Sequence, residues 1–153
     1  MEKGVNVFLD DLREQFQLGH VDLRTYSPLT LAYMGDAVYE LVIRTIVVSQ
    51  GNSSPNKLHQ RASAIVKASA QAELAEHIFP LLKEEEAQIY QRGCNAKPYS
   101  IAKNASKKDY CKATGLETLI GYLYLQENMS RVLELMKAGL KCMDNKYIHT
   151  ILQ

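Results

Sequence analysis

Apolar residues recur at helical spacing along most of the chain and divide it into successive amphipathic segments. Helices are predicted over residues 5–17 and 28–49, from 55 onward, up to 77–79, over 81–91, from about 115, and from 130 to about 140. We find no convincing set of alternating strands, no internal repeat and no low-complexity linker. The pattern therefore predicts an all-α helical bundle of five to seven helices, folded as a single domain over residues 1–153.

Local signals mark where several of these helices begin. Ser27–Pro28 and Ser54–Pro55 each place a capping hydroxyl before a proline at the first helical position, where the missing N–H costs nothing. Ser130 is a suitable N-cap for the last helix. The three glutamates at 84–86 are expected to lie exposed on the helix over 81–91.

Composition is typical of a soluble globular protein, with 46% hydrophobic and 23% charged residues in a chain of 153. The formal net charge of +1 neither favours nor excludes a nucleic acid partner, so only local clustering of charge is informative. The N-terminus lacks the apolar segment of a signal peptide, and no apolar run of roughly 18 residues predicts a membrane span. We therefore expect a cytoplasmic protein with no membrane partner.

The three cysteines, Cys94, Cys111 and Cys142, show neither a CxxC spacing nor a Cys/His ligand pattern. Their number is odd, and the four histidines show no metal-binding spacing either. We therefore expect reduced thiols in a cytosolic protein, and neither a disulfide scaffold nor a zinc site.

The helix over 28–49 contains Gly35 and Asp36 near its middle, within LAYMGDAVYE. Both residue types weaken helices, so a property other than helix stability must account for their presence here. One interpretation of Asp36 is a solvent-exposed ladder with Glu40 and Arg44 at i,i+4 spacing. Against it, the helix is apolar nearly all round, which is typical of a helix at the centre of a domain. A carboxylate in such surroundings needs a partner or a metal.

A second carboxylate, Glu117, lies in GLETLIGYLYL, another apolar helix with Gly121 four residues later. It is either a first-turn glutamate that complements the helix dipole or one of two carboxylates that converge. In the second case the glycines let the two helices pack closely, so that Asp36 and Glu117 meet. Clustered carboxylates are the usual ligands of Mg²⁺, which prefers oxygen and keeps several waters. Such a site supports phosphoryl chemistry.

A basic segment over 92–112 immediately precedes Glu117 and carries six positive charges against one negative. Its residues suit contacts with phosphate and sugar in RNA, although an ordinary solvated lysine loop is the alternative. The candidate RNA-binding residues are Arg92, Asn95, Lys97, Lys103, Lys107 and Lys108.

The chain resembles the ribonuclease III family at two motifs, the signature helix LTLAYMGDAVYE and the second acidic motif GLETLIGYLYL. The resemblance is closest to the mini-ribonuclease III subgroup, which LHQRASAIVKASAQAE, RGCNAK and LIGYLYL also fit. It covers roughly residues 24–140. Each motif is short, but their order, spacing and helical context together are specific.

This resemblance implies an all-α ribonuclease III endonuclease domain that works as a homodimer. It implies Mg²⁺-dependent hydrolysis of double-stranded RNA to 5′-phosphate products, with Asp36 and Glu117 as catalytic residues and metal ligands. The subgroup's substrate is precursor 23S ribosomal RNA. A ribosomal protein on that RNA is a further candidate partner.

Two positions depart from standard ribonuclease III, which has carboxylates where this chain has Ala32 and Thr114. The reduced acidic set favours one firmly held Mg²⁺ per subunit, with a second arriving only with substrate. We expect no separate double-stranded RNA-binding domain, so the segment over 92–112 is the candidate arm that holds RNA. The missing carboxylates keep one alternative open, a non-catalytic ribonuclease-III-like RNA-binding or ribosome-assembly module.

Overall fold

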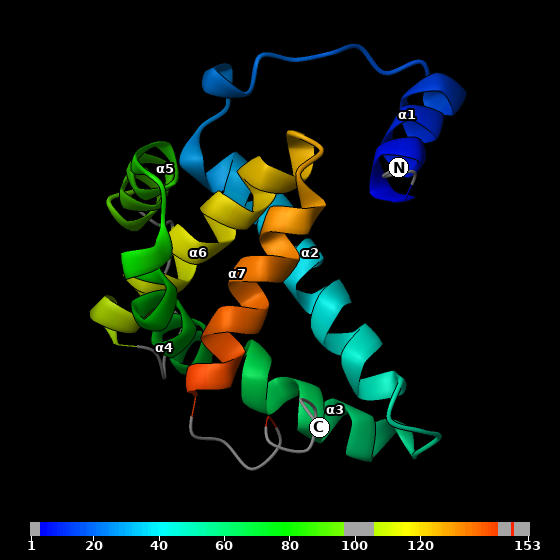
Figure 1. Cartoon of the computed structure of the whole chain (residues 1–153), viewed down its shortest axis with the longest axis vertical. Coiled ribbons are helices and arrows are strands. Elements are labelled where there is room, and N and C mark those ends of the chain that lie inside the picture. Colours follow the sequence, from blue (N-terminus) through cyan, green and yellow to red (C-terminus); the bar gives the residue numbers. More distant parts are fainter. Residues whose placement is uncertain (1–3, 97–105, 144–147, 149–153) are drawn as a thin grey trace.

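The computed structural model describes residues 4–96, 106–143 and 148, and every regular element in these residues is a helix (Figure 1). The predicted all-α class is therefore confirmed. No helix in the described ranges is long and apolar enough to cross a membrane. The α-helices are α1 Gly4–Phe16, α2 Pro28–Val48, α3 Pro55–Val66, α4 Ala68–Ile78, α5 Glu84–Cys94, α6 Lys107–Leu125 and α7 Met129–Cys142, with short 3₁₀ helices at Leu23–Thr25 and Phe79–Leu81.

Helix α6 forms the centre of the bundle (Figure 1). It packs most extensively against α2 and also against α5 and α4, while α7 packs on α4 and α6. All of its residues at 113–116 and 118–123 are buried. Because Glu117 interrupts this buried stretch, its carboxyl group lies close to the core of the domain.

Helix α2 differs from the expectation of a helix that is surrounded on every side. Its buried face packs into the core, but three large apolar side chains lie on the opposite face. Tyr33 is 84% exposed, Leu41 is 64% exposed and Val48 is 59% exposed. An apolar pattern identifies residues that avoid water, but it does not tell whether the cover comes from the same chain or from a second one.

The predicted starts of α2 and α3 are confirmed. The side chain of Ser27 accepts a hydrogen bond from the amide of Thr30, and that of Ser54 accepts one from the amide of Lys57. In both helices a proline occupies the first turn. These two caps fix where the long helix that carries Asp36 begins and where the next one follows.

The starts of α6 and α7 were predicted too late. Helix α6 begins at Lys107 and not near residue 115, with Ser106 as its N-cap. Helix α7 begins at Met129, and its cap is Asn128 and not Ser130. The first two turns of α6 are polar and show no apolar period, so periodicity alone does not distinguish them from a loop.

The expected exposure of the glutamates at 84–86 is wrong for Glu86, which is 4% exposed. Its carboxylate accepts hydrogen bonds from Arg131 at 2.8 and 2.9 Å, and Arg131 also donates to the main-chain oxygen of Leu81. The hydrogen bond from Arg131 is the main reason that the pKa of Glu86 lies below its usual value. This ion pair joins the start of α5 to the start of α7.

The expectation of three reduced thiols is also wrong, since Cys94 and Cys111 form a disulfide with a Cα–Cα distance of 4.4 Å. Cys142 is a free, exposed cysteine. The pair joins the last residue of α5 to the second turn of α6, and α5 packs on α6. Because α6 begins earlier than predicted, its first turns bring Cys111 back beside Cys94, which sequence spacing alone does not reveal.

Candidate active site

Helices α2 and α6 cross at two glycines, Gly35 and Gly121. A Cβ atom on Gly35 would overlap the main-chain oxygen of Glu117, and one on Gly121 would overlap the main-chain oxygen of Leu31. Each added Cβ would also lie 2.9 Å from the amide nitrogen of the other glycine. The two backbones are thus in direct contact, which any side chain at these positions would prevent. The predicted close packing of the two glycine-containing helices is confirmed.

This crossing brings the carboxyl groups of Asp36 and Glu117 into hydrogen-bonding contact. Asp36 is exposed on α2, whereas Glu117 is partly buried on α6. Burial raises the pKa of Glu117 to about 8, and the hydrogen bond and negative charge of Asp36 add to the rise. Without a cation, Glu117 therefore retains its proton near neutral pH.

The alternative ladder of Asp36, Glu40 and Arg44 forms only in part. Arg44 donates to the carboxylate of Glu40 through its Nε at 3.0 Å, one turn along α2 from the site. Asp36 instead faces Glu117 on α6. Arg44 therefore pairs with the carboxylate of Glu40 and does not neutralise the Asp36–Glu117 pair.

Tyr39 anchors the helix next to this pair. Its side chain is completely buried, and its hydroxyl donates to the main-chain oxygen of Ile65 in α3 at 2.8 Å. Burial raises the pKa of Tyr39 above its usual value, and the charge of Glu117 adds to the rise. The hydroxyl therefore stays protonated and links α2 to α3.

Ala32 and Thr114, the positions where standard ribonuclease III has further carboxylates, are 8% and 5% exposed. Within the described residues, no group of three or more His, Cys, Asp or Glu side chains is arranged to hold a metal ion. Mg²⁺, however, is commonly bound by one or two carboxylates, with waters and substrate phosphate in the remaining positions. The two facing carboxyl groups of Asp36 and Glu117 suit one such ion.

Four of the six candidate RNA-binding residues lie where the end of α5 meets the start of α6, and all four are exposed: Arg92, Asn95, Lys107 and Lys108. Lys97 and Lys103 lie outside the described residues. A further lysine of this segment, Lys112, forms an ion pair with Glu76 on α4. Lys112 is therefore already paired within the protein. In the described part of the segment over 92–112, the exposed positive charges are those of Arg92, Lys107 and Lys108.

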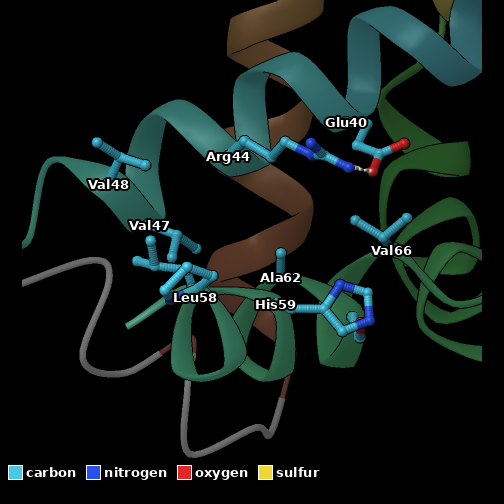
Figure 2. Close-up of a pocket in the computed structure, with 10 residues that line it drawn as sticks. Glu40, Arg44, Val47, Val48, Leu58, His59, Ala62 and Val66 are labelled. Carbon is cyan, nitrogen blue, oxygen red and sulfur yellow. Dashed lines mark hydrogen bonds and ion pairs between the residues drawn. The ribbon is translucent and has the colours of Figure 1, made fainter. Parts of the chain in front are cut away.

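A separate cavity of about 360 Å³ opens between α2 and α3 (Figure 2). Apolar side chains of both helices line it, and the Arg44–Glu40 ion pair and His59 lie at its edge. Sequence analysis did not single it out, because its apolar residues follow the same period as core residues. Neither Asp36 nor Glu117 lines this cavity, so the candidate site is the helix crossing itself.

Residues 29–128 match the family model of the ribonuclease III domain. The chain belongs to the ribonuclease III family. The matched range includes Asp36, Glu117 and both glycines of the crossing, so the candidate site lies within the ribonuclease III domain of this chain.

Individual proteins that are similar to this chain carry the name of the subgroup that the motifs indicated. Mini-ribonuclease 3 of Clostridium tetani is 49% identical over 117 residues, which are 76% of this chain and 78% of that protein. Mini-ribonuclease 3 of Thermoanaerobacter sp. strain X514 is 44% identical over 138 residues, 88% of this chain and 95% of that protein. A crystal structure from Fusobacterium nucleatum has a TM-score of 0.71 at 32% identity and covers 78% of this chain and 96% of its own. The resemblance to the mini-ribonuclease III subgroup is therefore confirmed.

Proposed function

We propose that this protein is a Mg²⁺-dependent endoribonuclease that cleaves double-stranded RNA. The observation that carries the proposal is the glycine crossing of α2 and α6, which holds the carboxyl groups of Asp36 and Glu117 against each other. Membership of the ribonuclease III family and the names of the Mini-ribonuclease 3 relatives support the same reaction class.

Asp36 and Glu117 would hold one Mg²⁺ through their carboxylate oxygens. When bound, the ion supplies Lewis acidity, which lowers the pKa of water and stabilises charge on the departing 3′-oxygen of the RNA. Glu117 must first release the proton that its raised pKa retains near neutral pH, so cation binding is coupled to proton release. The backbone contact of Gly35 with Gly121 keeps the two carboxyl groups at a fixed spacing. No side chain is needed as a nucleophile, and the products would carry 5′-phosphates.

The exposed cations at the α5–α6 junction would hold the duplex. Lys107 and Lys108 begin the helix that carries Glu117, so phosphate contacts there lie on the same element as the site. Arg92 on α5 and Asn95, directly after its end, extend this surface, and Lys97 and Lys103 remain predicted contacts. Replacing Lys107 and Lys108 by alanine should weaken duplex binding and lower the slope of log affinity against log salt by about 2. The matched control replaces Lys137 and Lys141, both exposed on α7, and should leave that slope unchanged.

We infer that the working form is a homodimer. The exposed face of α2 carries Tyr33, Leu41 and Val48, which lie on one side of the helix at its 100° step per residue. Several large apolar side chains exposed on one side of a helix are typical of a protein–protein interface. Because Asp36 lies on the same helix close to this face, a second copy packed here would place two sites near each other, one for each RNA strand.

The proposed substrate is precursor 23S ribosomal RNA, processed in the cytoplasm, with a ribosomal protein on that RNA as a candidate partner. This assignment rests on the subgroup resemblance. A duplex read by its A-form shape and 2′-hydroxyls fits a surface built mainly from lysine and arginine.

The deciding experiment is cleavage of a labelled RNA duplex with Mg²⁺ or with a chelator, by wild type, Asp36→Asn and Glu117→Gln. Glu40→Gln is the matched control, because it removes a carboxylate one turn along α2 from Asp36 that pairs with Arg44. Wild type and the control should cut the duplex only with Mg²⁺, and the two site variants should lose cleavage while retaining duplex binding. If wild type binds the duplex and cuts it no better than the site variants, the non-catalytic RNA-binding module is correct.

A further inference from the structure

Cys94 and Cys111 lie at the junction where the exposed cations gather. Cys94 is the last residue of α5, and Cys111 lies in the second turn of α6. They are 17 residues apart in sequence, and their disulfide holds the Cα atoms 4.4 Å apart. The bond therefore links the last residue of α5 covalently to the second turn of α6.

The packing of α5 on α6 is held independently of this bond. A Cβ atom on Gly93 would lie 3.0 Å from the Cα atom of Gly115, and one on Gly115 would lie 2.8 Å from the main-chain oxygen of Tyr90. This second glycine contact adjoins Cys94 and lies one turn from Cys111. Breaking the disulfide leaves the two helices in contact, so the sulfur atoms stay close enough to join again.

The surroundings of the two sulfur atoms suit exchange with small disulfides. Both cysteines are partly exposed, so reagents in solution have access to them. Lys107 and Lys108 precede Cys111 by one turn, with one acidic residue, Asp109, in the same turn. Cysteines that react in thiol–disulfide exchange are found in partly exposed, electropositive environments of this kind.

We propose that Cys94 and Cys111 form a reversible thiol–disulfide pair, a redox modification site that adds or removes a covalent link between the end of α5 and the second turn of α6. The oxidant is a low-molecular-weight disulfide such as oxidised glutathione. One cysteine thiolate attacks it, which forms a mixed disulfide and expels one thiol. The second cysteine then attacks the protein-bound sulfur and expels the second thiol. Two electrons and two protons pass from the protein to the small disulfide, and excess small thiol reverses both steps.

A consequence for RNA binding follows, and it rests on the proposed function. The closed bond limits the movement of the end of α5 relative to the start of α6, and so holds Arg92, Lys107 and Lys108 in one arrangement. Cations that are already held in place lose less conformational freedom when they contact RNA. The oxidised protein should therefore bind a duplex about threefold to tenfold more tightly than the reduced protein.

The test uses the full chain with Cys142→Ser, which leaves only the pair, and a control with all three cysteines replaced by serine. Each protein is equilibrated with oxidised or reduced glutathione, alkylated and weighed by mass spectrometry, and its melting temperature is measured. The affinity for a labelled duplex is then determined in chelator, so that no cleavage occurs.

With the pair present, the reduced form should take up two alkyl groups and the oxidised form none. Oxidation should also raise the melting temperature by about 5 °C or more. The cysteine-free control should show neither redox-dependent melting nor redox-dependent affinity. Two alkyl groups after oxidation, or equal melting temperatures for the two forms, would overturn the proposal. If the bond forms and raises the melting temperature but neither form binds RNA, the thiol pair is supported and the proposed function fails.

Discussion

Replacing Gly35 by alanine is expected to force α2 away from α6 and to disrupt the carboxyl pair. On helix propensity alone, alanine would stabilise α2 by about 1 kcal/mol. The new Cβ, however, would overlap the main-chain oxygen of Glu117 and lie 2.9 Å from the amide nitrogen of Gly121. A backbone cannot rotate out of the way as a side chain can, so the two helices must separate. Overpacking of this kind commonly costs about 1–3 kcal/mol, and the loss of contact along the longest helix pair of the core places it at the upper end.

The net loss of about 2 kcal/mol should lower the melting temperature by about 4–8 °C. The cleavage rate should fall by more than this loss of stability explains. The reason is that a displacement of about 1 Å at a reacting centre lowers the rate roughly a hundredfold. The assay compares thermal unfolding with duplex cleavage at a temperature where both proteins remain folded.

Gly19→Ala is the matched control for this substitution. Gly19 is exposed, and a Cβ there would meet no heavy atom within 4 Å. This variant should melt and cleave as wild type does. If Gly35→Ala melts at the wild-type temperature and cleaves at the wild-type rate, the close glycine crossing does not position the site and the reasoning is wrong.

Three further predictions concern the cation, the dimer and the buried ion pair. The Mg²⁺ concentration for half-maximal cleavage should fall as pH rises from 6 to 8 and then level off, because the ion competes with the proton that Glu117 holds up to a pKa of about 8; a pH-independent requirement would contradict this. Leu41→Glu should shift the protein from dimer to monomer in sedimentation. The control Leu133→Glu changes a leucine that is also exposed, but on α7, and should leave the dimer intact. Arg131→Met should cost about 3 kcal/mol in urea unfolding at pH 7, because it leaves the buried carboxylate of Glu86 without its charged partner, although the main-chain amide of Lys83 still donates to it; since the pair with Arg131 lowers the pKa of Glu86, the cost should shrink as pH falls below the usual value for glutamate.

The start of α2, the helix that carries Asp36, followed from local chemistry. Ser27–Pro28 marks the start of α2 because a capping hydroxyl and a fixed proline φ both act within one turn. Gly35 and Gly121 were informative because a glycine inside an apolar helix weakens it, and close contact between backbones is a reason to retain it. The sequence could predict that Asp36 lies close to Glu117 only on the condition that their two helices pack together.

Other features depended on contacts that no local pattern encodes. Glu86 lies in a run of three glutamates, and only Arg131, 45 residues away, determines that this one is buried. Cys94 and Cys111 come together because α6 starts at Lys107, with Ser106 as its N-cap, in a polar stretch without an apolar period. The exposure of Leu41 reflects the absence of a covering element in the described part of the same chain. The sequence pattern thus does not predict which distant residues pair with each other. It also does not predict which apolar surfaces stay exposed for contact with another chain.

The most direct test of the site is a ¹³C NMR titration of the Glu117 side-chain carboxyl, with its signal assigned by comparison with Glu117→Gln. Without divalent cation, the pKa should be about 8, against a usual value of 4.5. If Asp36 and Glu117 together hold Mg²⁺, saturating Mg²⁺ should bring that pKa well below neutral, because the bound cation favours the carboxylate. A pKa near 4.5 without Mg²⁺, or one near 8 that Mg²⁺ does not move, would contradict the assignment of this carboxyl pair as the metal site.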